Sequence, residues 1–232
     1  ALDNVELNAI LNLNIDWKKL ILKNDPSIYY IGNLALSNGE TKKLLTVSST
    51  RMGVAASSIL TTKICLKFKP KYIFMSGICA GIKDKVGIGD IIIADPVWEW
   101  GSGKSTIIDN QQIHQPSPHQ ISIDASLRSE LQTYSRTNEF LEKIYNTCNI
   151  KNKPKNTLKI HLGPMATGPS VLQDEHIVRR IRSSNKDILA IEMEAYGVLL
   201  AAETAHTPSP KIIIIKSVSD FADIDKNDLW QE

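Results

Sequence analysis

The chain contains few of the residues that mark several large protein classes. Its 232 residues include three cysteines, Cys65, Cys79 and Cys148, which are odd in number and far apart in sequence. Neither a disulfide framework nor a paired-cysteine metal site is therefore predicted, and a reducing, cytoplasmic location is expected. Apolar runs such as KIIIIKSV, residues 211–218, are too short to span a bilayer.

Charge and histidine spacing exclude further classes. The 27 Lys and Arg residues nearly balance the 25 Asp and Glu residues, which gives a net charge of +2. So small an excess does not favour a nucleic acid or an anionic membrane as a partner. The five histidines show no ligand spacing, so we expect no metal and no cofactor.

Short apolar segments alternate with helical patterns along the chain. Residues 71–78, 89–97 and 211–220 are rich in Ile, Val and Phe, which is typical of strands covered on both faces. Further strands are predicted at residues 43–49, 157–168 and 188–193, and helices at residues 5–13, 53–67, 124–146, 173–183 and 195–206. The polar residues 108–120 are predicted to form a surface loop. This alternation predicts a three-layer α/β fold.

We expect residues 1–232 to form one domain. The first residues read as the start of a helix with no strand before it, and the last residues end where another helix should begin. Domain ends normally fall in polar linkers. We therefore expect that a first strand and a last helix are missing and that the chain is part of a longer protein.

Acidic residues occur at two places in apolar surroundings. The stretch ILAIEMEAYGVLLAA, residues 188–202, contains Glu192 and Glu194, and the apolar strand at 211–218 is followed by Ser219 and Asp220. Acids at such positions can cap a helix, or they can be solvated acids at the start of a helix, where the helix dipole favours negative charge. They can also act as general acids in a dry pocket, where desolvation raises the pKa. The residues alone leave both explanations open.

Two glycine-rich segments are candidates for ligand-binding turns. In SGICAGIKDKVGIGD, residues 76–90, Gly77 and Gly81 bracket the end of a strand. Open α/β sheets bind small ligands at such ends, and glycine lets backbone amides approach a ligand closely. An ordinary strand-to-loop turn explains the pattern equally well. WGSGKST, residues 100–106, is similar to a P-loop, but Trp98 stands where that motif needs its first glycine, so a plain turn is expected.

Taken together, these motifs resemble the purine nucleoside phosphorylase and nucleosidase superfamily. The resemblance rests on segments that follow the family's order along nearly the whole chain: ALDNVELNAIL, MSGICAGI, GPMATGPSVL, AIEMEAYGV and SVSDFAD. The branch resembled most is the methylthioadenosine/S-adenosylhomocysteine nucleosidase type, especially its variants within larger bacterial proteins. The resemblance implies a mixed central sheet between helices, no cofactor, a small nucleoside substrate and a homodimer or larger homo-oligomer.

The resemblance also implies a reaction and roles for individual residues. The reaction is cleavage of the N-ribosidic bond of a purine nucleoside, or of a related thio-nucleoside or nucleotide. Asp220 matches the acid that protonates purine N7. Glu194 matches the carboxylate that binds the ribose hydroxyls and stabilises the cationic sugar. Met193 matches the residue that packs against the sugar, and Glu192 an acid with a supporting role near it.

Base recognition in the resembled family involves the glycine turn and the segment before residue 173. Val171 and Leu172 stand where the nucleosidases carry a stacking aromatic residue and an aliphatic one. Because Val171 cannot stack, the identity of the base stays open, and Trp98 and Trp100 are candidates for the missing ring. The remaining expected substrate-binding residues are Cys79, Ala80, Gly81 and Ser219.

Water is the expected nucleophile. Met75 and Ile78 occupy the positions where bacterial phosphorylases hold phosphate with an arginine and a serine, and neither side chain can do so. Glu6 matches the glutamate that orients water in the nucleosidases. Two alternatives remain: a phosphorylase with another anchor, such as Arg51, and a nucleotide-sensing module of a larger signalling or defence protein.

Overall fold

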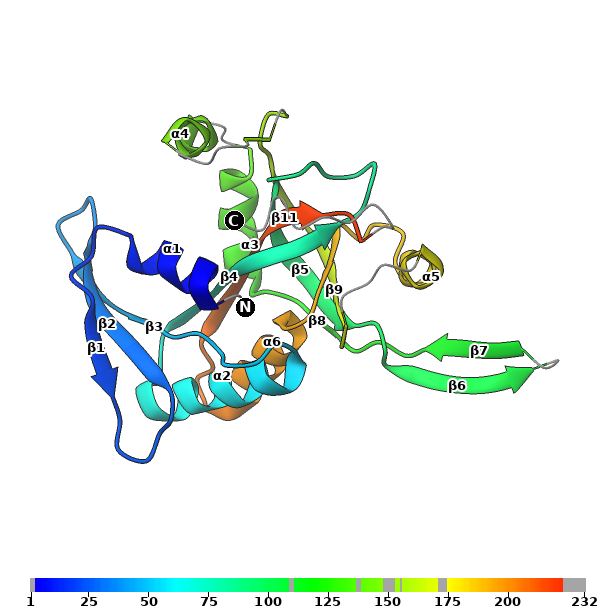
Figure 1. The fold of residues 1–232 in the computed structure, drawn as a ribbon, viewed down its shortest axis with the longest axis horizontal. Coiled ribbons are helices and arrows are strands. Elements are labelled where there is room, and N and C mark those ends of the chain that lie inside the picture. Colours follow the sequence, from blue (N-terminus) through cyan, green and yellow to red (C-terminus); the bar gives the residue numbers. More distant parts are fainter. Residues whose placement is uncertain are drawn as a thin grey trace. The chain divides into compact units, whose positions relative to one another are not determined.

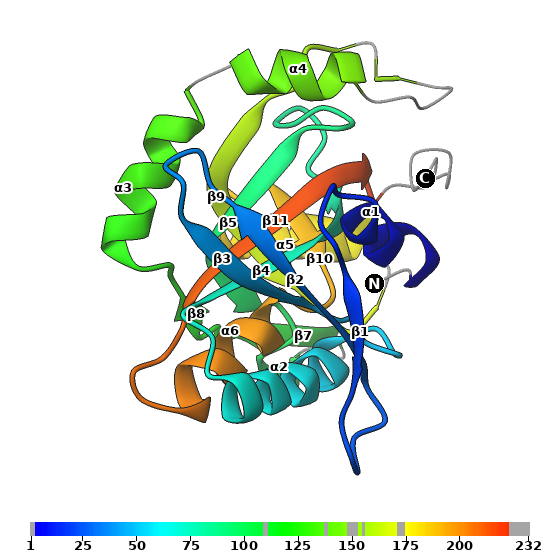
Figure 2. The same ribbon diagram turned by 90° about the vertical axis from the view of Figure 1, so that its left-hand side faces the viewer.

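A computed structural model of the chain describes residues 3–108, 111–136, 139–147, 153–154, 156–170 and 175–222. The chain divides into two compact units, Ala1–Met52 and Gly53–Glu232. Figure 1 and Figure 2 show the elements of both units, coloured along the sequence. Each unit is described by itself.

The first unit combines a short helical segment with a three-stranded antiparallel sheet. A π-helical turn, η1 (Asp3–Leu7), leads into α1 (Asn8–Leu11), where the sequence predicted a helix over residues 5–13. The sheet has the order β1-β2-β3, formed by β1 (Lys18–Ile21), β2 (Ile28–Ala35) and β3 (Thr41–Thr46). The strand predicted at 43–49 is β3, whereas β1 and β2 were not predicted.

The second unit is built around a mixed sheet of six strands with the order β11-β4-β10-β9-β5-β8, in which β11 also pairs with β5. The strands are β4 (Tyr72–Gly81), β5 (Ile91–Glu99), β8 (Gln120–Ile121), β9 (Ile160–Thr167), β10 (Ala190–Glu192) and β11 (Lys211–Asp220). β4 runs parallel to β11, and β9 parallel to both β5 and β10, while β5–β11, β4–β10 and β5–β8 are antiparallel. The mixed sheet expected from the sequence is confirmed.

Helices cover both faces of this sheet, which explains the continuous apolar strands. The helices of the second unit are α2 (Val54–Phe68), α3 (Ala125–Tyr134), α4 (Glu139–Thr147), α5 (Glu175–Ser184) and α6 (Ala195–Ala205). Ile213 of β11 packs with Leu127 of α3, whereas the next residue, Ile214, packs with Val198 of α6. Because successive strand residues point to opposite faces, a strand between two helical layers is apolar throughout. The predicted three-layer α/β architecture is confirmed.

The helices α2 and α6 lie side by side (Figure 1, Figure 2) at a glycine. A Cβ atom on Gly197 would lie 2.5 Å from the carbonyl oxygen of Val54 and 2.6 Å from Oγ of Ser58. The Ser58 hydroxyl donates a hydrogen bond to the carbonyl of Gly197 across this contact, at 3.1 Å. The absence of a side chain at residue 197 therefore sets how closely the two helices approach.

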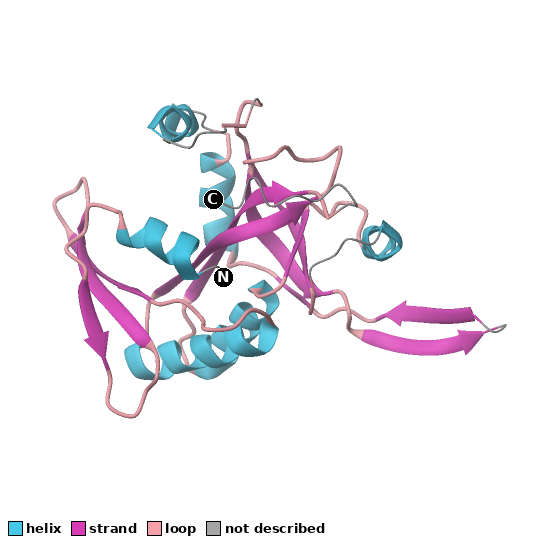
Figure 3. Ribbon diagram, in the orientation of Figure 1, coloured by secondary structure: helices cyan, strands magenta, loops and turns pink. Residues whose placement is uncertain are grey.

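Two expectations about local structure were wrong. The segment 108–120, predicted to be a loop, contains strand residues: β7 (Gln111–Pro116) pairs with β6 (Gly103–Ile108) as an antiparallel hairpin, drawn in Figure 3 as strands of their own small sheet. Its cross-strand pairs include Thr106 with Ile113, so β-branched residues favour pairing although the segment is polar. The helix predicted over 124–146 is two helices, α3 and α4.

Candidate active site

Strand pairing brings together two motifs that are far apart in sequence. β4 and β11 run parallel, with Val218 opposite Cys79 and Asp220 opposite Ala80. The register shifts between Val218 and Asp220, and Ser219 lies in this irregularity. The Ser219 hydroxyl donates to the carbonyl oxygen of Cys79 at 3.4 Å. The glycine turn and the acidic end of β11 therefore meet at the carboxyl ends of two parallel strands, where open α/β sheets bind ligands.

Gly81 is required by packing at this edge. A Cβ atom there would lie 2.6 Å from Cγ2 of Val86 and 2.8 Å from Cγ1 of Val218. Both atoms belong to buried valines, so a side chain at residue 81 would push directly on the strand that carries Asp220. The role of Cys79, Ala80 and Gly81 in substrate binding stays a prediction.

Asp220 is a buried acid at the end of β11. Its residue is 7% exposed. Its Oδ1 accepts a hydrogen bond from the backbone N–H of Ala222 at 3.0 Å, and its Oδ2 lies 3.1 Å from the Ser219 hydroxyl. The contact to Ala222 is the turn contact of a capping acid. Burial of the carboxyl group also suits a general acid, so the two explanations are compatible in one residue.

Glu192 is tied to the protein by several hydrogen bonds. Its Oε1 accepts from the Thr167 hydroxyl at 2.6 Å, and its Oε2 from the backbone N–H of Glu194 at 2.9 Å. Both oxygens lie 3.0 Å from the backbone N–H of Ala195. Two of these donors belong to the start of α6, so the carboxylate satisfies amides that have no partner within the helix. Glu192 therefore joins β10, β9 and α6.

Glu194 precedes α6 and points to different partners. Its Oε1 accepts from the backbone N–H of Gly53 at 3.1 Å, and its Oε2 from Nζ of Lys216 at 3.3 Å. Burial alone would raise the pKa of Glu194, but the Lys216 ammonium group and the Gly53 amide lower it overall. Both glutamates are buried, which excludes the interpretation of solvated acids at the start of a helix.

Lys216 is the residue at this site that the sequence analysis missed. It lies in β11, is 2% exposed, and places Nζ 3.1 Å from Oε2 of Glu192 and 3.3 Å from Oε2 of Glu194. Burial acts to lower its pKa, but the charges of Glu192 and Glu194 outweigh burial and raise the pKa. The available signal was a charged residue inside the apolar run KIIIIKSV, since lysine is almost never fully buried unless it is paired.

The Cys79 thiol is not a nucleophile. Burial raises the pKa of its thiol, and this effect outweighs the nearby Lys216 charge. The thiolate is the reactive form of cysteine, so a thiol that stays protonated is inert. Cys79 packs with core residues such as Val218, and it contributes shape to the site.

The other expected site residues are spread over the chain. Met193 is half-buried between the two glutamates, and Glu6 is half-buried in η1 of the first unit. Trp98 is 1% exposed within an apolar cluster, so it is not available as a stacking ring. Val171 and Leu172 lie outside the described residues.

Trp100 packs against Gly168, which lies within the expected base-contacting segment, residues 163–172. A Cβ atom on Gly168 would lie 1.7 Å from Nε1 of Trp100, and the Arg180 guanidinium lies 5.6 Å from the centre of the indole ring. The indole is therefore held between Gly168 and α5. Its expected contact with a base stays a prediction.

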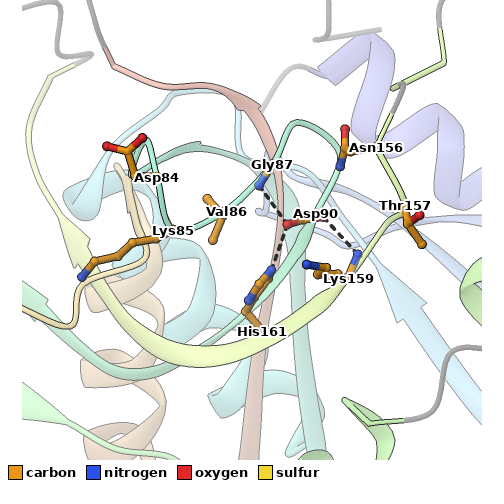
Figure 4. Close-up of a pocket in the computed structure, with 9 residues that line it drawn as sticks. All are labelled: Asp84, Lys85, Val86, Gly87, Asp90, Asn156, Thr157, Lys159 and His161. Carbon is orange, nitrogen blue, oxygen red and sulfur yellow. Dashed lines mark hydrogen bonds and ion pairs between the residues drawn. The ribbon is translucent and has the colours of Figure 1, made fainter.

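A separate polar cavity of about 250 Å³ lies between the loop after β4 and the segment before β9. Figure 4 shows Asp90 at its centre, with hydrogen bonds from the backbone N–H groups of Gly87 at 2.9 Å and Lys159 at 3.0 Å and a hydrogen bond between its Oδ2 and Nε2 of His161 at 2.8 Å. The carbonyl of Asp90 also accepts from the N–H of Val218 at 2.9 Å. Asp90 thus holds these loops against the part of β11 that precedes Asp220.

Neither a metal site nor a membrane span is found in the part of the chain that the structure describes. Among these residues, no group of three or more His, Cys, Asp or Glu side chains is arranged to hold a metal ion. None of the described helices is both long and apolar enough to cross a bilayer.

Comparison with known proteins gives consistent matches. A family model described as "Phosphorylase superfamily" matches residues 19–232. The chain is 33% identical over 224 residues to the uncharacterized protein y4jS of Sinorhizobium fredii, covering 96% of this chain and 54% of that protein. It is 26% identical over 196 residues to the ATP nucleosidase Cap17 of Escherichia coli, covering 80% of this chain and 38% of that protein. The chain thus spans about half, or less, of these relatives.

Solved structures share the fold. The S-adenosylhomocysteine nucleosidase of Streptococcus pyogenes, crystallised with 5-methylthiotubericidin, superposes with a TM-score of 0.69 at 21% identity. The match covers 97% of this chain and 83% of that one. At this identity the likeness concerns the fold.

Proposed function

The chain belongs to the phosphorylase superfamily, and from this premise we propose that it hydrolyses the N-ribosidic bond of a purine nucleoside, or of a related thio-nucleoside or nucleotide. The observation that carries the proposal is the gathering of buried acids around strand ends. Glu192 ends β10, Glu194 precedes α6, and Asp220 ends β11 in register with the glycine turn. Buried acids are costly unless they are paired or functional.

The proposed chemistry divides the work between two carboxyl groups. The bond between C1′ and the purine nitrogen breaks, and its electron pair goes to the purine. Asp220 gives a proton to N7, which turns a poor anionic leaving group into a neutral one. Glu194, held ionised, binds the ribose hydroxyls and stabilises the positive charge that develops on the sugar. Water adds its oxygen to C1′ and passes a proton to a carboxylate base, and exchange through solvent returns a proton to Asp220.

Water is favoured over phosphate by the side chains around the glycine turn. Met75 and Ile78 are half-buried apolar residues of β4, and an apolar wall offers a phosphate dianion no hydrogen bonds. Lys216 is already paired with Glu192 at 3.1 Å and with Glu194 at 3.3 Å, so its charge is not available to hold a phosphate. The expected role of Glu6 in orienting the attacking water stays a prediction. Arg51 is the first residue to test if phosphate proves to be the nucleophile.

Two of the similar proteins suggest the substrate class. One is called an S-adenosylhomocysteine nucleosidase and the other an ATP nucleosidase. Both names describe an adenine base on ribose and differ in the group at the 5′ carbon. We therefore propose an adenine nucleoside or nucleotide as the substrate and leave the 5′ group to experiment.

A substrate panel tests the proposal. Adenosine, methylthioadenosine, S-adenosylhomocysteine, AMP and ATP are incubated separately with the purified protein, and released adenine is measured by chromatography. Release of adenine from at least one substrate, lost in Asp220→Asn, supports the proposal. No release from any of them, by protein that binds an adenine nucleotide, would instead favour the nucleotide-sensing alternative.

The homodimer or larger homo-oligomer and the cytoplasmic location stay predictions. Light scattering coupled to gel filtration measures the oligomeric state. Fractionation of cells that carry the tagged protein tests the location.

A further inference from the structure

Lys216 occupies a position where a charged side chain needs a specific reason. Lys216 lies on β11, opposite Gly77 of β4 and Ile92 of β5. Two residues of the same strand, Ile214 and Val218, belong to the main core cluster. Removing an ammonium group from water costs several kcal/mol before any partner is counted. At this position the partners are the carboxylates of Glu192 and Glu194.

The two glutamates differ in how fully the protein uses them. Glu192 accepts from the Thr167 hydroxyl and from the amides of Glu194 and Ala195 in addition to Lys216. A carboxylate offers about four acceptor positions, so these contacts use the capacity of Glu192. Within the part of the chain that the structure describes, the Glu194 carboxylate accepts from the Gly53 N–H and from Nζ of Lys216. Glu194 therefore keeps acceptor capacity for the hydroxyl groups of a sugar.

We propose that Lys216 is a positioning residue that keeps Glu194 ionised and oriented for the sugar, and that Glu192 serves Lys216 and the start of α6 rather than the substrate. This inference rests on the proposed function, because it specifies how the proposed ribose-binding acid is prepared. The local charges explain why the lysine is needed. Burial acts to raise the pKa of Glu194, and the Lys216 ammonium group 3.3 Å from Oε2 is the largest effect that lowers it.

Lys216→Met removes the charge and keeps a similar length. The titratable groups that face Lys216 are Glu192 from β10, Glu194, which directly precedes α6, and Cys79 from β4. In the variant we expect the pKa of Glu194 to rise, which carbon-detected NMR of the glutamate carboxyl groups measures directly. Lys216→Arg keeps the charge and should keep the pKa of Glu194 low.

Kinetics separates positioning from a purely structural role. A charge-assisted hydrogen bond lost at Glu194 should lower kcat/KM by about 10- to 100-fold, and the acidic limb of its pH profile should move to higher pH because Glu194 must be ionised. If Lys216 acts through Glu194, adding Lys216→Met to Glu194→Gln should cause little further loss. Lys211→Met is the matched control, since Lys211 lies on the same strand but forms a partly exposed ion pair with Asp124, and it should keep wild-type kcat/KM.

The outcomes separate this inference from the proposed function. If the wild type releases adenine but Lys216→Met leaves the acidic limb unchanged and its loss adds fully to that of Glu194→Gln, the positioning role is overturned. If the wild type releases no base, the proposed function fails, and the NMR titration still decides whether Lys216 holds Glu194 ionised. Should Lys216→Met not fold, Lys216→Met combined with Glu192→Gln removes the unpaired second acid, and the same titration and kinetics apply.

Discussion

Replacing Asp220 by asparagine should abolish most of the activity while leaving the fold intact. The residue is 7% exposed, and its Oδ1 accepts from the N–H of Ala222 at 3.0 Å. An asparagine keeps an oxygen for that N–H, and its amide can donate to the Ser219 hydroxyl, which lies 3.1 Å from Oδ2. What it cannot do is give a proton to the purine. Loss of a general acid typically costs about 10²- to 10⁴-fold in rate, or about 3–5 kcal/mol of transition-state stabilisation.

The assay compares adenine release and thermal unfolding of Asp220→Asn with those of a matched buried acid. Asp95 on β5 is 6% exposed and pairs with Arg128 at 2.8 Å, so Asp95→Asn removes a buried carboxylate away from the proposed site. We expect Asp95→Asn to lower the unfolding temperature and keep the rate, and Asp220→Asn to keep the unfolding temperature and lose most of the rate. An Asp220→Asn variant with nearly the wild-type rate would refute the assignment of the general acid.

Four further predictions follow from named contacts. Glu194→Gln should lower kcat/KM less on a 2′-deoxyribose substrate than on ribose; equal losses would exclude a contact to the 2′-hydroxyl. Gly81→Ala should destabilise the protein by about 1–3 kcal/mol through overpacking, measured by urea unfolding, and unchanged stability would contradict the 2.6 Å clash with Val86. Thr167→Val should cost about 1–3 kcal/mol because Glu192 loses a 2.6 Å hydrogen bond. The pKa of Glu194 is lowered and that of Lys216 is raised. The pair should therefore stabilise the fold less as the pH falls below the ordinary glutamate pKa and as it rises above the ordinary lysine pKa. A contribution to the free energy of unfolding that stays constant across both pH ranges would contradict this prediction.

The sequence predicted the elements whose pattern is set by burial. The segment 211–220 was predicted as a strand and is β11, because its residues are covered on both faces and must be apolar. The segment 195–206 was predicted as a helix and forms α6 over Ala195–Ala205. The hairpin of β6 and β7 was missed because both strands are polar, so composition suggested a loop whereas cross-strand pairing produces a sheet.

The site was predicted in part. Glu192 and Glu194 stood out because acids interrupt an apolar stretch, and that signal is local. Lys216 interrupts an apolar strand in the same way, but its meaning depends on partners 22 and 24 positions earlier in the chain, which only the folded sheet brings within 3.3 Å. The fixed contacts of Glu192 likewise depend on Thr167 of another strand.

Identifying the nucleophile tests the proposed hydrolysis most directly. The purified protein is incubated with its best substrate in water enriched in ¹⁸O, with and without phosphate, and the sugar product is analysed by mass spectrometry. The oxygen at C1′ of a free sugar also exchanges slowly with water. The product is therefore reduced within seconds to stop this exchange, and ribose added directly to the enriched water serves as the exchange control. Hydrolysis predicts a free sugar that carries one ¹⁸O and a rate that phosphate does not change. A sugar 1-phosphate, or a rate that saturates with phosphate, would contradict the account.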